Sequence, residues 1–272
     1  MEGLTHLLEA SSLSGQSVPS VVIGNFLQKC TSYASGKKVK EWSQPEEAAA
    51  AGHTFLLSRL LHFGRGQRCW EAAAEHGHLS TIKWLHHSKL EGCTTEVMKF
   101  AAQEGHLELV KWLHQNRKEG TSFYAMNNAA KNGHLHVVRW LHWNRKEGCS
   151  QRAFDLAAEN GHLQIVEWLH RNRKEGGTTR AMDNAATKGQ LTVVEWLHWH
   201  RREGCTSKAL DGAAQNNQLV TLQWLMANRR ERPTVHAAIS AAKAGHLEVV
   251  EWLGDPGAAD CVAAADARHA AA

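Results

Sequence analysis

The sequence predicts an all-α solenoid of stacked helix-turn-helix repeats. Three patterns predict it, and each recurs at a step of 28 residues: a Trp-Leu pair, an Ala-Ala pair and a glycine. The tryptophans of the Trp-Leu pairs are Trp84, Trp112, Trp140, Trp168, Trp196, Trp224 and Trp252. The glycines are Gly77, Gly105, Gly133, Gly161, Gly189 and Gly245, and Asn217 takes the remaining place. Self-similarity at a period of a few tens of residues is typical of stacked-repeat proteins.

The repeat divides the chain into four segments. Residues 1–45 do not fit the period, and we expect a partly helical N-terminal extension there. Residues 46–66 keep the alanines and a glycine but no tryptophan, as expected of a degenerate capping repeat. Residues 67–253 hold seven repeats of 28 residues. The Ala-rich tail, residues 254–272, is expected to be weakly helical or disordered, and its composition does not decide between the two.

Each repeat is expected to contain two helices. In the repeat that starts at Thr94, this threonine is a good N-cap, and the alanines near Ala101 belong to one face of a short first helix. Gly105 then suits the left-handed conformation that ends many helices. The second helix should start near His106 and bury leucine, valine and Trp112. A short charged loop leads to the next repeat, so the connections between repeats are brief.

Composition narrows the class of protein. The chain has 272 residues, a hydrophobic content of 43% and a net charge of +4, too near balance to indicate nucleic acid or membrane binding from bulk charge. Cys93, Cys149 and Cys205 lie two repeats apart, too far to form disulfides with one another, which suits a reducing compartment. We find no signal-peptide pattern and no membrane-length apolar run. We therefore expect a monomeric cytoplasmic protein, with the nucleus also possible.

The pattern A-A-x-x-G-H-L-x-V-V-x-W-L resembles the ankyrin repeat. The segments AAKNGHLHVVRWL (129–141), AAENGHLQIVEWL (157–169) and AAKAGHLEVVEWL (241–253) match the second half of that motif. The resemblance implies an ankyrin-like array that binds protein partners on its concave side. Two departures stand out: the usual T-P-L-H opening is absent, and the period is about five residues shorter than the family's usual 33. We infer that the projecting hairpins of the family are reduced to short loops here.

Histidines form two periodic series, but no metal site is expected. One series follows the glycine turn and the other follows the Trp-Leu pair, so neighbouring members stand a helix layer of roughly 8–10 Å apart. Four ligands cannot converge on one ion in that arrangement. We expect turn-stabilising hydrogen bonds from the first series and a solvated edge from the second. The first series is His78, His106, His134, His162 and His246, and the second is His86, His114, His142, His170 and His198.

The sequence indicates neither catalysis nor a cofactor. The glycine-flanked serine of hydrolases, the phosphate-binding glycine loop and the H-E-x-x-H zinc motif do not occur in it. The segment GKKVK (36–40) has no glycine cradle before its lysines, so it does not predict a phosphate site. We therefore expect no catalytic residues, no metal and no cofactor.

A basic edge offers one alternative function. The loops after the second helices each carry two cations from residue 117 onward, and Trp143 and Trp199 interleave with them, as aromatic side chains do in nucleic-acid grooves. A glutamate follows each pair and halves the local charge. Cations at helix C-termini also complement the helix dipole without any ligand. Nucleic-acid binding is therefore not the favoured function. The cation pairs are Arg117-Lys118, Arg145-Lys146, Arg173-Lys174, Arg201-Arg202 and Arg229-Arg230.

The candidate binding residues are those that differ between repeats. Two positions of the first helix change freely, and we expect both to face outward on the concave side, where a protein partner would bind. Unconstrained surface variation would give the same pattern. Trp143 and Trp199 share a different exposed position and are possible anchors for a partner, although duplication of a two-repeat unit explains their spacing equally well. The predicted concave-face residues are Glu96, Lys99, Tyr124, Asn127, Arg152, Asp155, Arg180, Asp183, Lys208 and Asp211.

The sequence therefore predicts a non-catalytic scaffold for protein-protein interaction, holding its partner along the concave first-helix face. Two alternatives remain open at this stage. One is polyanion binding through the Arg/Lys edge. The other is an adaptor that uses residues 17–33 to dock a second partner, because this segment distantly resembles the start of an F-box.

Overall fold

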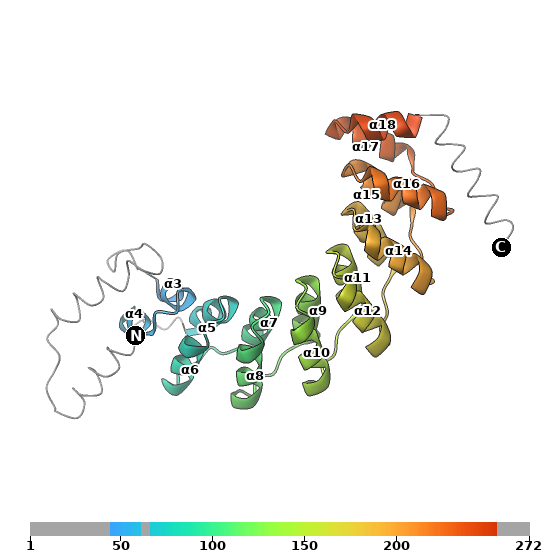
Figure 1. Ribbon diagram of the computed structural model, residues 1–272. Coiled ribbons are helices and arrows are strands. Elements are labelled where there is room, and N and C mark those ends of the chain that lie inside the picture. Colours follow the sequence, from blue (N-terminus) through green and yellow to red (C-terminus); the bar gives the residue numbers. More distant parts are fainter. Residues whose placement is uncertain (1–43, 61–65, 255–272) are drawn as a thin grey trace, which may run out of the picture. The chain divides into compact units, whose positions relative to one another are not determined.

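Helices follow the repeat in pairs throughout the computed structural model, which describes residues 44–60 and 66–254 (Figure 1). Within these ranges every regular element is a helix, as the repeat predicts. The predicted docking segment 17–33, the tail beyond residue 254 and nearly all of the N-terminal extension lie outside the described residues. The chain forms two compact units, residues 1–92 and residues 93–272.

The described residues of the first unit, 44–60 and 66–92, form two helix pairs. They are α3 (Pro45–Ala50) with α4 (Thr54–Leu60), and α5 (Gly66–Glu75) with α6 (Leu79–His87). Helix α3 packs on α5, and Gly52, with φ +74°, makes the turn between α3 and α4. The segment that we expect to be a degenerate capping repeat thus forms a helix-turn-helix in its described residues. Trp70 is fully buried here, and its indole N–H donates to the carbonyl of Leu90 at 3.3 Å.

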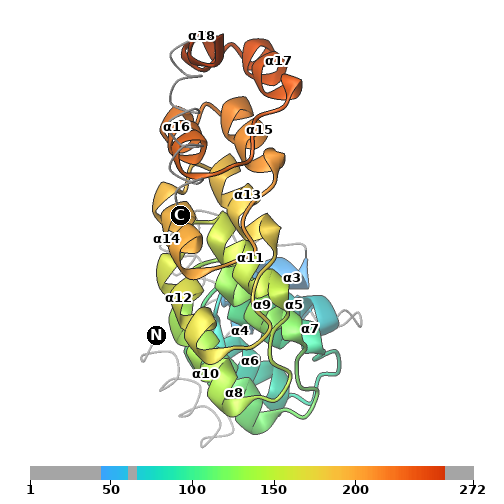
Figure 2. The ribbon, with the colours of Figure 1, turned by 90° about the vertical axis from the view of Figure 1, so that its right-hand side faces the viewer.

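Residues 93–254 of the second unit form six helix pairs. Each first helix packs on the next first helix and on the second helix of its own pair, so the first helices form one row, as Figures 1 and 2 show. The first helices are α7 (Thr95–Gln103), α9 (Phe123–Lys131), α11 (Gln151–Glu159), α13 (Thr179–Thr187), α15 (Ser207–Gln215) and α17 (Val235–Ala244). The second helices are α8 (Leu107–Asn116), α10 (Leu135–Asn144), α12 (Leu163–Asn172), α14 (Leu191–His200), α16 (Leu219–Asn228) and α18 (Leu247–Gly254).

Local sequence determines where the helices begin and end. Thr94, as predicted, caps α7, because its hydroxyl oxygen accepts the backbone N–H of Glu96 at 3.3 Å. The helix ends before Gly105, whose φ of +79° is costly for any residue with a Cβ. A Cβ on Gly105 would also lie 2.6 Å from the imidazole Nδ1 of His134 in the next repeat. The glycine therefore allows the chain to turn here and leaves room for His134 of the neighbouring repeat.

The core is a stack of small and aliphatic side chains. The alanine pairs of the first helices are almost fully buried except in α17, where Ala242 is exposed. A valine and a leucine are also buried in each of α8, α10, α12 and α14. The tryptophans of the Trp-Leu pairs differ from the prediction, because only Trp168, at 9% exposure, is buried, whereas Trp112 and Trp140 are half-buried. Their rings lie at the rim of each layer, so the leucines fill the layers more than the tryptophans do.

Candidate functional site

Five of the predicted binding residues share one position of the first helices and lie at the surface of the row that these helices form. Tyr124 is 46% exposed, and Arg152, Arg180 and Lys208 are exposed at the same position in the following three repeats. Glu96 takes this position in α7 and is half-buried. We call these five residues the first-helix face.

Lys99, a sixth predicted residue, is half-buried and engaged within its own helix. Its ammonium group pairs with the carboxylate of Glu96 and lies 4.5 Å from the ring centroid of Phe100. Both partners belong to α7, so this lysine stabilises its helix locally as an i,i+3 pair does.

The second predicted position of the first helices lies three residues after the first one. We expected it to face outward, and that expectation was wrong. Asn127, Asp155 and Asp183 are buried, with exposures of 1%, 7% and 5%, and Asp211 is half-buried. The predicted row of outward-facing acids is therefore absent from the surface of α11 and α13. The position points toward the next repeat instead of toward solvent.

These buried side chains connect neighbouring repeats. One carboxylate oxygen of Asp155 accepts the backbone N–H of Thr178, the cap of α13, and the other accepts its hydroxyl, both at 2.8 Å. Buried polar groups need such partners, and two bonds to one carboxylate satisfy that need. The equivalent pairs are Asp183 with Thr206, Asp211 with Thr234 and Asn127 with Ser150.

Burial also changes the pKa of Asp183 at this position. Desolvation raises the pKa of the Asp183 carboxyl, while the hydrogen bonds from Thr206 and the charge of Lys208 oppose that rise. The carboxylate is thus directed inward, into the boundary between repeats, whereas the ammonium group of Lys208 is exposed.

The three cations of the first-helix face stand in the first turns of their helices. Arg152, Arg180 and Lys208 are each the second residue of α11, α13 and α15. None of these three first turns contains an acidic residue, whereas that of α7 contains Glu96. The positive end of a helix dipole disfavours a cation at this place.

An aromatic depression adjoins the cations. Phe123 and Tyr124 pack with ring centroids 4.3 Å apart. They line an open hollow of about 610 Å³ together with Ser150, Gln151, Arg152 and Glu175. Phe123 is 39% exposed and was not predicted. A signal was present in the sequence, since α9 alone among the first helices of the second unit begins with two aromatic residues.

Trp143 and Trp199 are exposed, as expected, at 73% and 74%. They lie near the ends of α10 and α14, on second helices, and therefore not in the first-helix row. Trp143 borders an open groove of about 410 Å³ that Arg139 and Trp168 also line. Whether either tryptophan anchors a partner stays a prediction.

The arginines of the basic edge are engaged inside their loops. Each pairs with the glutamate two residues later, as Arg173 does with Glu175, where Nε donates to Oε2 at 3.2 Å. The Nη1 group of the same arginine donates to Nδ1 of His142 in the preceding repeat at 3.3 Å. The second cation of the pair, Lys174, is exposed. The edge therefore offers fewer available cations than its sequence indicates.

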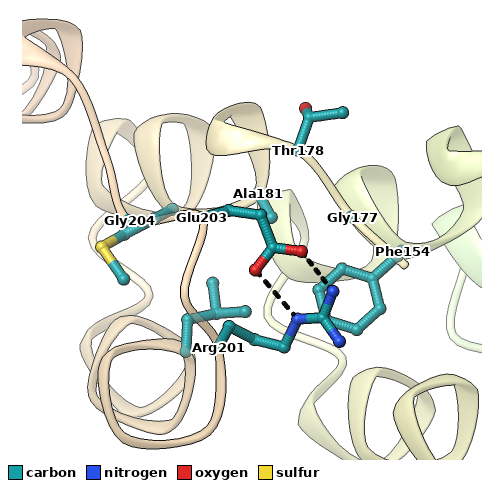
Figure 3. A pocket seen from close by; sticks show the side chains of 9 residues that line it. Phe154, Gly177, Thr178, Ala181, Arg201, Glu203 and Gly204 are labelled. Atoms are coloured by element: carbon teal, nitrogen blue, oxygen red, sulfur yellow. Dashed lines mark hydrogen bonds and ion pairs between the residues drawn. The ribbon is translucent and has the colours of Figure 1, made fainter.

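Figure 3 shows a variation of this loop around Arg201. Gly177 stands where neighbouring repeats have cysteine, and the guanidinium carbon of Arg201 lies 5.4 Å from the ring centroid of Phe154 while the same group pairs with Glu203. A Cβ at Gly177 would lie 2.4 Å from the ring of Phe154. The cavity between these groups holds about 10 Å³, room for one water molecule at most and not for a ligand.

The two histidine series behave differently from each other. In the first, a hydrogen bond forms near the turn as predicted: Nε2 of His162 donates to the carbonyl of Lys131, in the preceding repeat, at 3.0 Å. The second series was expected to be solvated, and that was wrong. The ring of His142 lies edge-on to Trp168 of the next repeat, at 5.0 Å between centroids. The equivalent pairs are His114 with Trp140, His170 with Trp196 and His198 with Trp224.

Family comparison decides what this architecture is. A family model of ankyrin repeats, described as three copies, matches residues 69–155, 98–180 and 126–211, which together exceed half of the chain. The chain belongs to the ankyrin repeat family. No curated protein is significantly similar in sequence. Among solved structures, the human ASB11 ankyrin repeat domain is similar, with 20% identity and a TM-score of 0.49, over 71% of this chain and 100% of that one.

The ankyrin repeats of this chain are short ones. In the second unit, the connection from each second helix to the next first helix contains no strand, as in residues 117–122 between α8 and α9. Ankyrin repeats are generally protein-protein interaction modules, and the family is typically non-catalytic. In the part of the chain that the structure describes, no group of three or more His, Cys, Asp or Glu residues could hold a metal ion. No helix in those residues is long and apolar enough to cross a membrane.

Proposed function

We propose that this chain is a non-catalytic scaffold that binds a protein partner along the first-helix face. The observation that supports this most is the contrast between repeated and unrepeated residues. Buried positions such as Ala157 and Leu169 are the same in nearly every repeat. The exposed position of the first helices changes from glutamate to tyrosine to arginine and lysine, so each layer presents its own chemistry.

The structure revises the residues of the proposed site. The five residues of the first-helix face remain, and Phe123 joins them because it lines the hollow beside Arg152. Lys99 leaves the site, because its ammonium group is engaged within α7. Asn127 and the three aspartates leave the site, because their side chains bond the caps of the next helices.

We also propose that the protein works as a monomer in a reducing compartment, the cytoplasm or the nucleus, with residues 67–253 as its binding array. Burial raises the pKa of Cys93 to about 11 and that of Cys205 to about 12. Both side chains are therefore neutral thiols with little reactivity at neutral pH. Polyanion binding is the weaker candidate, since the arginines of the basic edge already pair with glutamates.

A site-specific cross-linking experiment tests the proposed face. A photo-reactive residue is placed at position 124 or 180 of the first-helix face, or at position 143 or 199 on the second helices. We expect one protein partner to cross-link from positions 124 and 180, and the product to disappear when Arg152→Glu is added, because that exposed side chain lies between them in the row. Cross-links that form only from positions 143 and 199 would move the site to the tryptophans.

A further inference from the structure

We propose that the partner presents an acidic segment in polyproline II conformation, with an acidic residue at every third position and an apolar residue three positions from the first acid. The inference rests on the proposed function, since it names the chemistry of the partner at the first-helix face. It follows from four features of the second unit: the cations, the inward acids, the spacing of the repeats and the aromatic hollow.

The cations of the face are available to a ligand. None of the ion pairs formed within residues 44–60 and 66–254 involves Arg152, Arg180 or Lys208. Helix stability does not explain them either, because a cation in the first turn opposes the helix dipole. Three such cations in successive repeats therefore indicate selection for something outside the chain.

The acids near this row are bonded within the chain. Glu175 lines the hollow beside Arg152, and its carboxylate pairs with Arg173. Asp155 lies one repeat before Arg180, and its carboxylate accepts hydrogen bonds from Thr178 at the repeat boundary. Asp183 lies one repeat before Lys208, and its carboxylate accepts hydrogen bonds from Thr206 in the same way. Asp183 is close enough to Lys208 for the lysine charge to oppose the rise of its pKa, but its side chain is buried. A partner approaching the first-helix row meets the cations first.

The repeat spacing selects the conformation of the partner. Stacked helices lie roughly 8–10 Å apart, so successive cations stand about that far from each other. A polyproline II segment advances about 9 Å in three residues and returns to the same face, because it has three residues per turn. A β-strand of similar rise turns every third side chain to the opposite face. An acid at every third position of polyproline II thus meets Arg152, Arg180 and Lys208 in turn.

Tyr124 at one end of the aromatic hollow fixes the register. It takes the face position one repeat before Arg152, so an apolar side chain packed on its ring lies one layer, or three partner residues, from the first acid. Beyond the hollow, Glu96 takes the face position and would repel a further acid. The arrangement accommodates one apolar anchor and three acids.

Synthetic peptides test this proposal on the full chain. The matched peptide has ten residues, with leucine first, glutamate at the fourth, seventh and tenth positions, and proline or alanine elsewhere. One comparison peptide has the same composition with its glutamates adjacent, a second has glutamine for glutamate, and each is also made in reversed order. Binding is measured by fluorescence anisotropy at low salt, where exposed charges are least screened.

We expect the matched peptide, in one of its two orders, to bind roughly tenfold tighter than the clustered and glutamine peptides. Arg180→Glu should weaken it by about the same factor and should still fold, since an acid in the first turn suits the helix dipole. Lys174→Glu, at an exposed loop position, makes the same change of charge and should alter binding by less than about twofold.

Equal binding of the matched and glutamine peptides would overturn the acidic partner, and equal binding of the matched and clustered peptides would overturn the spacing. Tight binding of a single-stranded RNA probe that Lys174→Glu abolishes, with no peptide bound, would replace the proposal by polyanion binding at the basic edge. If no acidic peptide binds while protein cross-links persist from position 180, the further inference fails and the proposed function stands.

Discussion

At the scale of single residues, the aspartates of the first helices show how one carboxylate joins two repeats. Asp183 is 5% exposed, and its two oxygens accept the N–H and the hydroxyl of Thr206 at 2.7 and 2.9 Å. Thr206 in turn caps α15 by accepting the N–H of Lys208. One aspartate thus supports the start of the next helix through the residue that caps it.

We expect Asp183→Ala to lower the free energy of unfolding by about 1–3 kcal/mol, because it leaves two donors of Thr206 without their partner. Asp183→Asn should cost less, since Asn127 makes the equivalent pair of bonds with Ser150. Urea unfolding of the full chain measures both. Lys208→Ala, at an exposed neighbour, is the control and should stay within about 0.5 kcal/mol. A loss for Asp183→Ala as small as that of the control would show that the aspartate does not hold the boundary.

At the scale of the elements, α8, α10 and α12 are each joined to the end of the next second helix by a histidine and an arginine. His142 lies in the last turn of α10 with its ring against Trp168, and its Nδ1 accepts from Arg173, the C-cap of α12. His170 repeats the arrangement with Trp196 and Arg201, at 3.1 Å from Nη1 to Nδ1. A histidine that accepts from arginine must be neutral, so the contact between elements depends on its protonation state.

Acid should therefore destabilise the second unit. Desolvation lowers the pKa values of His142 and His170 below the usual 6.5. The charge of Arg173 lowers that of His142 further, and the charge of Arg201 does the same for His170. Glu175 and Glu203 oppose the shift, while His200 and Arg171 add to it at His170. The unfolded chain thus binds protons more readily. The stability these groups contribute is complete above pH 6.5 and is lost as pH falls toward their folded pKa values.

Urea unfolding between pH 7.5 and pH 5 measures this effect. We expect the free energy of unfolding to fall with pH, and the slope to decrease in the double variant His142→Met and His170→Met, because methionine takes the same position naturally at Met226. Some slope should remain, since His134 also has a lowered pKa, caused mainly by desolvation. An unchanged slope in the double variant would exclude these two histidines as the source.

The sequence predicted the elements better than the boundaries between them. A period of 28 residues places the helices of residues 66–254, most turn glycines and the exposed Trp143 correctly, because these depend on the chain's own helical periodicity. The inward aspartates escaped prediction because helical periodicity does not say what the next repeat presents. A polar pair offered the missing signal, since Thr178 follows Asp155 by 23 residues and the same spacing separates Asp183 from Thr206.

At the scale of the whole molecule, the residues that repeat form a framework, and those that differ between repeats form the proposed binding surface. The framework comprises the alanines, leucines, turn glycines and boundary pairs, which repeat because every layer meets the next in the same way. The proposed binding surface comprises Tyr124, Arg152, Arg180 and Lys208, which differ or carry charge where stability does not require it. Each set should therefore be changeable without the other.

One measurement tests this separation most directly. In a single variant, Tyr124, Arg152, Arg180 and Lys208 are all replaced by glutamine, and its unfolding and its affinity for the cross-linked partner are compared with those of the unaltered chain. We predict an unfolding midpoint that stays the same within error and a partner affinity at least about tenfold weaker. The matched variant Trp143→Gln with Trp199→Gln should keep the affinity. Unchanged affinity in the four-residue variant, with loss in the tryptophan variant, would contradict the account.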